Sequence, residues 1–339
     1  MNQAISSIRP NWVVPGARVL VTGAHLPMPP DGPPHVLIGT EDAFVVAAAH
    51  DRLRIIVPSG ASGTQPLRID ELPGETAYLE IAHVVVSGVH MVDSPAYGPD
   101  GRLYVTQSGD RSTKPSVPLY RVNRDGSKEP VTAELGNPTS LALGPDGTLY
   151  VSSRFEGLVY RVGPGDHAEV FASELGVPTG LAFGPDGRLY VGDRSGSILA
   201  VTPDRQVETI ATLPPSVAAF HLAFGPDENL YVTAPTLASH DAVYRITSDR
   251  IIDVVHDGFG RPQGLAFDAA GILYVAESLA GAAGLYRMDV SNGHPSPELV
   301  VAAPTLVGVT FDPFGGLLLA SNDTVWRLDN DLKPFVRTP

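Results

Sequence analysis

The sequence of 339 residues contains no cysteine. Disulfide bridges, thiolate metal sites and a cysteine nucleophile are therefore all excluded. Basic residues are also scarce, because 23 lysines and arginines stand against 37 aspartates and glutamates and leave a formal net charge of −14. A chain of this charge has no basic footprint for nucleic acid and no attraction to anionic membranes.

No stretch of the chain approaches the roughly 18 uninterrupted apolar residues that a membrane-spanning helix needs. The first residues, MNQAISSIRPNWVVPG, lack the basic start and the apolar run of a signal peptide. We therefore expect a soluble protein with the cytoplasm as its default location. A leader removed from the given sequence would instead direct it to the periplasm or out of the cell.

A repeated unit fills the last three quarters of the chain. Its clearest copy, GVPTGLAFGPDGRLYVGDRSGSIL at Gly176–Leu199, has the pattern of a strand, a tight turn, a second strand, a polar loop and a third strand. Copies recur every 40 to 46 residues and align on Tyr104, Tyr150, Tyr190, Tyr231, Tyr274 and Leu318. Strand-rich units with this period are the blades of a β-propeller, so residues 87–339 are predicted to form one with six blades.

Residues 1–86 lack the repeat and alternate short apolar strands with turn signals. In Leu53, Ile55 and Val57 the alternation of a half-buried strand is clear. The segments ISSIRPNWVVPGARVLVTGAHL and VLIGTEDAFVV resemble an IPT/TIG domain, an immunoglobulin-like β-sandwich. That resemblance implies a spacer or a contact site for a protein partner. The overall prediction is an all-β chain, and either the last repeat or Tyr78–Val85 supplies the strand that closes the ring.

Propeller geometry predicts where a ligand would bind. Loops that enter the inner strands, and loops that follow the second strands, surround one mouth of the channel, where a concave polar site is expected. Residues before the inner strands include Asp93, Thr139, Thr179, Phe220 and Gln263. Residues at the ends of the second strands include Arg154, Asp193, Arg194 and Glu277. Small-molecule binding is therefore expected at this mouth.

Two features of this mouth are distinctive. Arg154 and Arg194 lie on adjacent repeats and could clamp a carboxylate or phosphate, or form solvated salt bridges with Glu156 and Asp193. His221 occupies a position that is glycine or serine in the other repeats, namely Ser94, Ser140, Gly180, Gly264 and Gly308. A histidine here either adjusts the packing between blades or acts as a general base near neutral pH.

The repeat PTGLAFGPDGRLYVGD resembles NHL-repeat propellers and the regucalcin/gluconolactonase family, with a weaker likeness to streptogramin lyases. The resemblance implies a divalent cation, for which calcium is our expectation, held at the channel mouth by a Glu, an Asn and an Asp. Asp93 would replace the Glu, and Gln263 stands where the Asp is expected. Asp193 or Glu277 would complete the ligands by reaching inward.

Three functions remain open at this point. The first is a hydrolase for a lactone-like or ester-like small molecule, with Asp93, His221 and Glu277 as catalytic candidates and the cation held by Asp93, Gln263 and Asp193. The second is a propeller that binds a ligand or a protein without chemistry. The third is a metal-free lyase or hydrolase in which His221 is the base and the arginines bind an anionic substrate.

Overall fold

The computed structural model describes residues 4–72, 77–109, 114–279, 281, 283–291, 293, 295–329 and 332–335. It is built almost wholly of strands, which confirms the predicted all-β class. Among the described residues, no helix has the length and hydropathy to span a bilayer.

The N-terminal part is a sandwich of two sheets. One sheet has the strand order β1 (Ala4–Arg9), β3 (Arg18–Ala24), β7 (Arg52–Ile56) and β6 (Phe44–Ala49). The other contains β2 (Trp12–Val13), β9 (Ala77–Ile81), β8 (Gly63–Ile69), β4 (Val36–Ile38) and β5 (Glu41–Asp42). Leu53 and Ile55 of β7 are buried in the core between the sheets, whereas Arg52 and Arg54 face solvent. The alternation read from the sequence therefore defines the buried face.

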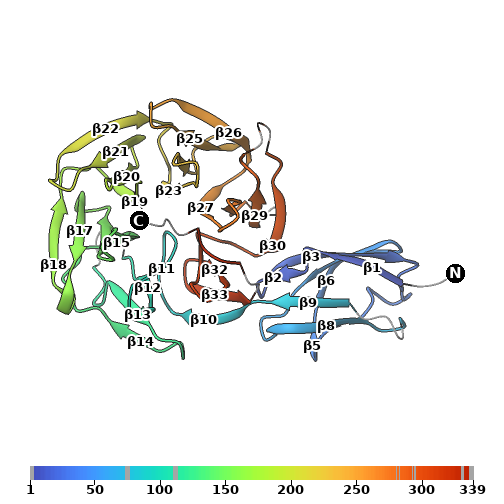
Figure 1. Cartoon of the computed structure of the whole chain (residues 1–339). Coiled ribbons are helices and arrows are strands. Elements are labelled where there is room, and N and C mark those ends of the chain that lie inside the picture. Colours follow the sequence, from blue (N-terminus) through green and yellow to red (C-terminus); the bar gives the residue numbers. More distant parts are fainter. Residues whose placement is uncertain are drawn as a thin grey trace.

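The repeats form four-stranded sheets arranged around a ring (Figure 1). Five blades, numbered I to V, each take four consecutive strands. Blade I has β11 (Ala96–Tyr97), β12 (Leu103–Thr106), β13 (Leu119–Val122) and β14 (Lys128–Pro130). Blade II has β15 (Pro138–Leu143), β16 (Leu149–Ser153), β17 (Leu158–Val162) and β18 (Ala168–Ala172). Blade III has β19 (Pro178–Phe183), β20 (Leu189–Asp193), β21 (Ser197–Val201) and β22 (Val207–Thr212).

Blade IV has β23 (His221–Phe224), β24 (Leu230–Thr233), β25 (Asp241–Ile246) and β26 (Ile252–Phe259). Blade V has β27 (Pro262–Phe267), β28 (Leu273–Glu277), β29 (Gly284–Met288) and β30 (Glu298–Ala302). Blade VI has β31 (Gly308–Phe311), β32 (Gly316–Ala320) and β33 (Thr324–Asp329), and it takes its fourth strand from elsewhere in the chain. The first strand of each blade lies nearest the channel.

The fourth strand of blade VI is β10 (His83–Ser87), which pairs antiparallel with β33. The ring is therefore closed by a strand from the N-terminal side of the repeats. The last repeat does not supply its own outer strand, because its described end turns to blade V, where Ala269 N–H donates to the Lys333 carbonyl at 2.9 Å. Strand β10 also spans the predicted domain boundary at residue 86.

Strand β2 joins the two parts of the molecule. It lies parallel to β30 of blade V on one side and parallel to β9 of the sandwich on the other. Blade V and the second sandwich sheet are therefore one continuous nine-stranded sheet (Figure 1). The N-terminal part is fixed to the ring by backbone hydrogen bonds.

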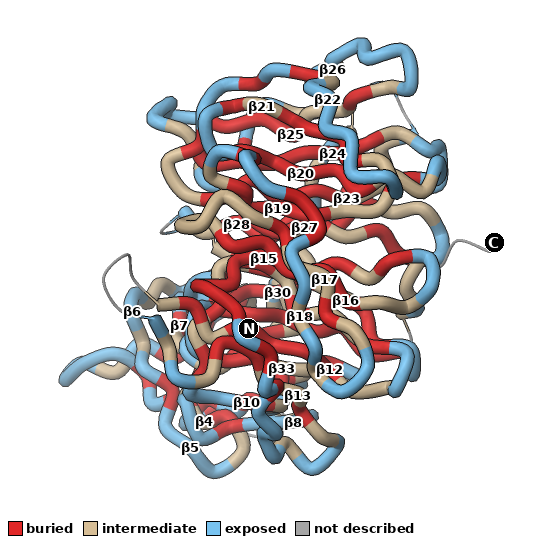
Figure 2. The backbone as a smooth tube through the Cα atoms, turned by 90° about the vertical axis from the view of Figure 1, so that its left-hand side faces the viewer, coloured by how far each residue is buried: buried red, intermediate tan, exposed pale blue. Residues whose placement is uncertain are grey.

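Aromatic pairs hold neighbouring blades together. The tyrosine of the second strand meets a phenylalanine of the next inner strand edge to face, with ring centroids 4.8 to 5.2 Å apart. These pairs are Tyr150–Phe183, Tyr190–Phe224, Tyr231–Phe267 and Tyr274–Phe311. Figure 2 shows the inner strands as buried, while outer strands such as β22 and β26 run along the surface. The repeat thus encodes the contacts between blades.

Candidate functional site

The inner strands approach each other closely at the level of His221. A Cβ atom at Gly308 would lie 2.5 Å from the Cα of Ser94, and one at Gly264 would lie 2.7 Å from the Cα of Gly308. Real side chains cannot occupy such spaces, so glycine is required at these points. The channel is therefore constricted here, and the His221 ring stands at a level where the neighbouring strands carry small residues.

His221 crosses the channel to the opposite side of the ring. Its Nδ1 atom lies 2.7 Å from Oδ1 of Asp93 in blade I, and its Nε2 atom lies 3.2 Å from Oε1 of Gln263 in blade V. The His221 side chain is 1% exposed and that of Asp93 is 9% exposed. Three blades thus meet through one buried polar cluster.

The carboxylate of Asp93 is held in its charged form. Burial by itself would raise the pKa of Asp93, but the positive charge and hydrogen bond of His221 oppose this. Hydrogen bonds from Ser140 and from the Ser94 N–H act in the same direction, and together they lower the pKa below its usual value. Both ring nitrogens of His221 face oxygen atoms, Nδ1 that of Asp93 and Nε2 that of Gln263.

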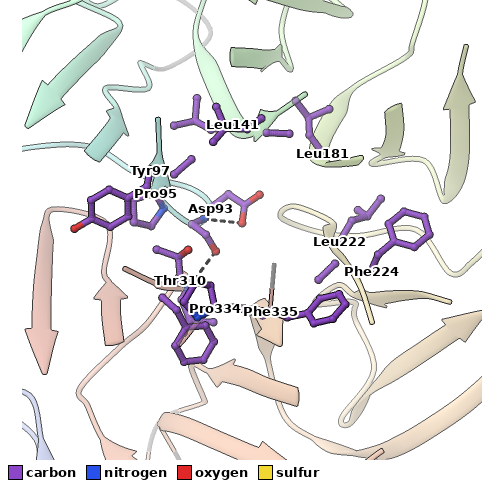
Figure 3. Close-up of a pocket in the computed structure, with 18 of the residues that line it drawn as sticks. Asp93, Pro95, Tyr97, Leu141, Leu181, Leu222, Phe224, Thr310, Pro334 and Phe335 are labelled. Atoms are coloured by element: carbon purple, nitrogen blue, oxygen red, sulfur yellow. Dashed lines mark hydrogen bonds between the residues drawn. The ribbon is translucent and has the colours of Figure 1, made fainter. Parts of the chain in front are cut away.

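A cavity of about 620 Å³ extends from this cluster toward the tight turns (Figure 3). Its inner end is formed by Asp93 and His221, and its outer rim by turn residues such as Gly98, Gly144 and Pro313. Inner-strand side chains form the walls, among them Leu141, Leu181, Leu222, Leu265, Val309 and Phe224. Pro334 and Phe335 of the C-terminal segment complete one side. The cavity runs away from the mouth at which the sequence analysis expected a ligand.

The carboxylates of Asp193 and Glu277 brace loops instead of reaching into the channel. Asp193 accepts hydrogen bonds from the Val177 N–H at 2.8 Å and from the Ser195 hydroxyl. Glu277 accepts from backbone N–H groups of its own blade, at Gly260, Arg261 and Leu279. Neither side chain joins the Asp93–His221 cluster.

Three more residues of the predicted site belong to the contacts between blades. Thr179 donates to the Gly192 carbonyl at 3.0 Å and accepts from the Phe220 N–H at 2.9 Å. Phe220 is packed in the core between blades III and IV. Thr139 is buried as well, and its hydroxyl has no hydrogen-bond partner in the described part of the chain.

Arg154 and Arg194 lie close enough to influence each other. Burial, together with the charge of Arg194, lowers the pKa of Arg154. Arg194 donates to the carbonyls of Ser216 and Val217, whereas Arg154 makes long contacts of 3.3 and 3.4 Å to the Gly109 carbonyl and the Ser108 hydroxyl. Neither arginine pairs with a carboxylate in the described ranges, so the salt bridges considered from the sequence are not found there.

The arrangement does not fit a hard divalent cation. Such an ion takes several oxygen ligands, usually with carboxylates among them. Within the described residues, no three His, Cys, Asp or Glu side chains lie together in a way that could hold a metal. Asp93 is the one carboxylate of the cluster, and His221 already binds it, while the oxygen of Gln263 faces the imidazole.

The pairing of Asp93 with His221 could not be read from the repeat alone. Both residues were singled out separately, one as a ligand and one as an exception to the glycine pattern. Their positions in the ring could have indicated the pairing, because the first and fourth of six repeats lie opposite each other. The apolar cavity and the contribution of Pro334 and Phe335 were missed, since nothing in the repeat places the C-terminal segment.

Comparison with known proteins agrees with this architecture. The sequence model of the SMP-30/Gluconolactonase/LRE-like region matches residues 40–236, which is more than half of the chain. The chain belongs to this family. No curated protein has a significant sequence match to this chain.

Solved structures share the fold at low identity. A gluconolactonase from Xanthomonas campestris is 16% identical, with 88% of this chain and 97% of that chain covered and a TM-score of 0.61. An auxiliary nutrient binding protein from Bacteroides thetaiotaomicron is 13% identical, with 96% and 97% covered and a TM-score of 0.56. A catalytically inactive virginiamycin B lyase from Staphylococcus aureus is 15% identical, with 86% and 95% covered and a TM-score of 0.54. These similarities concern the fold.

Proposed function

We propose that the protein is a metal-independent hydrolase of small esters or lactones, with the Asp93–His221 pair as its reacting group. Membership of a family that includes gluconolactonases supports the reaction class. The observation that carries the proposal is the 2.7 Å contact between Asp93 Oδ1 and His221 Nδ1 at the inner end of the cavity. A carboxylate bound to one imidazole nitrogen is how hydrolases orient a histidine base.

The reaction follows from the two ring nitrogens. In the reactive form the Nδ1–H donates to Asp93, and Nε2 carries the lone pair. Nε2 takes a proton from a water molecule while the water oxygen attacks the carbonyl carbon of the substrate. The tetrahedral intermediate then expels the alkoxide, which receives the proton from Nε2. An ester gives an acid and an alcohol, and a lactone gives a hydroxy acid.

Gln263 and the inner strands have supporting roles in this scheme. Gln263 holds Nε2 through a 3.2 Å contact, and this contact must open before a water molecule can reach the lone pair. Each inner strand is the edge strand of its sheet, and the Leu181 and Val309 N–H groups donate to the Ser140 and Ser94 hydroxyls of neighbouring blades, so the strands fix the geometry around the cluster.

The test is a panel of nitrophenyl esters and lactones, assayed with the wild type and His221→Gln. The variant is expected to lose about 10²- to 10⁴-fold in kcat, the usual contribution of a general base. His256→Gln in the outer strand of the same blade is the matched control and should retain full activity. Failure of the wild type to turn over any member of the panel would reject the hydrolase.

A second function, ligand binding without turnover, is favoured by one specific observation. Both nitrogens of His221 have partners, and the side chain is 1% exposed, so a base would have to be freed before it could act. If a bound ester or lactone is recovered unchanged after long incubation with the wild-type protein, this second function is favoured over hydrolysis.

A further inference from the structure

Polar side chains are few along the cavity. The lining residues with polar side chains are Asp93, Ser94, Tyr97, His221 and Thr310. The lining contains no arginine, lysine, asparagine or glutamine, whose side chains could donate hydrogen bonds to the hydroxyl groups of a sugar.

Most of these polar groups already serve the protein. Asp93 accepts from His221 and from the Ser94 N–H, and the Ser94 hydroxyl accepts from the Val309 N–H at 3.1 Å. Burial, reinforced by the charge of Asp312, raises the pKa of Tyr97 to about 12, so its hydroxyl stays neutral. A ligand with many hydroxyls would leave them without partners in this space, which is costly.

The walls offer apolar surface instead. The cavity is lined by leucines from blades II to V together with Phe224 and Phe335. Figure 3 shows several of these side chains around it. Its volume of about 620 Å³ is within the range of small-molecule sites. Each methylene group buried against such walls strengthens binding about fourfold.

We infer that the cavity receives a substrate with an apolar body, an alkyl or aryl ester or lactone, and that this substrate enters from the face of the tight turns. That the substrate is an ester or lactone rests on the proposed function, whereas its apolar body is inferred from the residues that line the cavity. Polyhydroxylated sugar lactones are excluded by the same lining. The carbonyl group of the substrate would lie at the inner end, near His221.

Binding of two lactams tests this inference without depending on catalysis. The δ-lactam analogues of δ-decalactone and of glucono-δ-lactone share one ring and resist hydrolysis, but one carries a pentyl chain and the other carries hydroxyl groups. Isothermal titration calorimetry with the whole wild-type chain is expected to show at least tenfold tighter binding of the alkyl lactam. Equal or tighter binding of the sugar lactam would overturn the inference.

Thr310 provides a matched pair of variants to locate the binding. In five blades the corresponding residue is an alanine paired with a bulky tyrosine, but Thr310 is paired with Leu318, which leaves more room for a larger side chain. Thr310→Phe should fill part of the cavity and weaken the alkyl lactam at least tenfold. Thr310→Val, which keeps the size and removes the hydroxyl, should bind it as well as the wild type. Thermal unfolding verifies that both variants are folded.

The outcomes separate this inference from the proposed function. Tight binding of the alkyl lactam with no hydrolysis of any ester keeps the substrate class and rejects the hydrolase. Hydrolysis of gluconolactone without binding of the alkyl lactam keeps the hydrolase and rejects the substrate class. Alkyl-lactam binding that is unchanged in Thr310→Phe places the ligand elsewhere and also rejects the inference.

Discussion

Oδ1 of Asp93 lies 2.7 Å from Nδ1 of His221, although the two residues are 128 positions apart and come from opposite blades of the ring. The contact bridges the channel where the neighbouring strands are closest. Two buried side chains in direct contact should be strongly coupled in their effects on stability.

Asp93→Ala should lower the free energy of unfolding by about 2–4 kcal/mol, because it leaves a buried imidazole without its partner. His221→Gly restores the residue of blades III, V and VI, so the double variant Asp93→Ala/His221→Gly should recover part of this loss. Urea unfolding of both single variants and of the double variant gives the coupling energy. Simple additivity of the two single changes would contradict the pairing.

The contribution of Asp93 to stability should depend on pH. Its folded pKa is lowered relative to the unfolded chain, so the stabilisation is present above the unfolded value of about 4. It should decline as the pH falls through the folded pKa. The difference in unfolding free energy between the wild type and Asp93→Asn is therefore expected to be constant near neutral pH and to shrink in acid. A difference that grew on acidification would refute the assignment.

Removal of divalent ions should leave both activity and stability unchanged. The reason is that the site offers one carboxylate, already bound to His221, to a cation that needs several. Elemental analysis of protein purified without chelator, followed by assay and thermal unfolding in EDTA, measures this. Stoichiometric calcium, zinc or manganese that is lost in Asp93→Ala would contradict metal-independent chemistry.

Val86→Asp in β10 should destabilise the ring strongly. Val86 is buried against blade I and blade VI residues, so an aspartate there would be an unpaired buried charge that costs about 3 kcal/mol or more. Val84→Asp in the same strand is the control, since Val84 is 55% exposed. Thermal unfolding should show a large shift for the first variant and a minor one for the second. Similar shifts would argue against β10 as the closing strand.

Glu228→Gly should stabilise the protein by about 0.5–1 kcal/mol. Glu228 ends the fourth copy of the tight turn with a φ of 63°, where three other copies have glycines with φ between 72° and 77°. The left-handed conformation costs a residue with a side chain roughly 1–2 kcal/mol, which the greater freedom of glycine in the unfolded state partly offsets. Urea unfolding measures the gain, and a loss of stability would show that the Glu228 side chain has a compensating role.

The fold was largely predictable because the repeat encodes local structure and packing together. The tyrosine of LYV and the phenylalanine of LAF each lie in a fixed register, so that Tyr190 meets Phe224 across the joint between blades III and IV. The pairing of β2 with both blade V and the sandwich could not be predicted. Trp12 and Val13 form a strand of two residues whose pairs lie far apart in the sequence, and local pattern gives no information on such contacts.

Asp93 and His221 could be singled out from the sequence, but their pairing and the cavity beside them could not. His221 was recognisable because a bulky side chain replaces glycine or serine, and Asp93 because it begins an inner strand. Asp193 and Glu277 occupy equivalent positions in the repeat. Their carboxylates accept hydrogen bonds from backbone N–H groups of nearby loops instead of reaching the channel. Hydrogen bonds with the local backbone compete with any contact across the channel.

Closure of blade VI by β10 also sets the order in which the ring can be completed. During synthesis β10 leaves the ribosome before blades I to V, and its partner β33 follows only after them. Until then Val86 and the open edge of β10 lack the strand that covers them. The newly made chain therefore carries an unsatisfied edge until β33 has been made, and it depends on prompt pairing with β33, or on a chaperone, to avoid pairing with another copy.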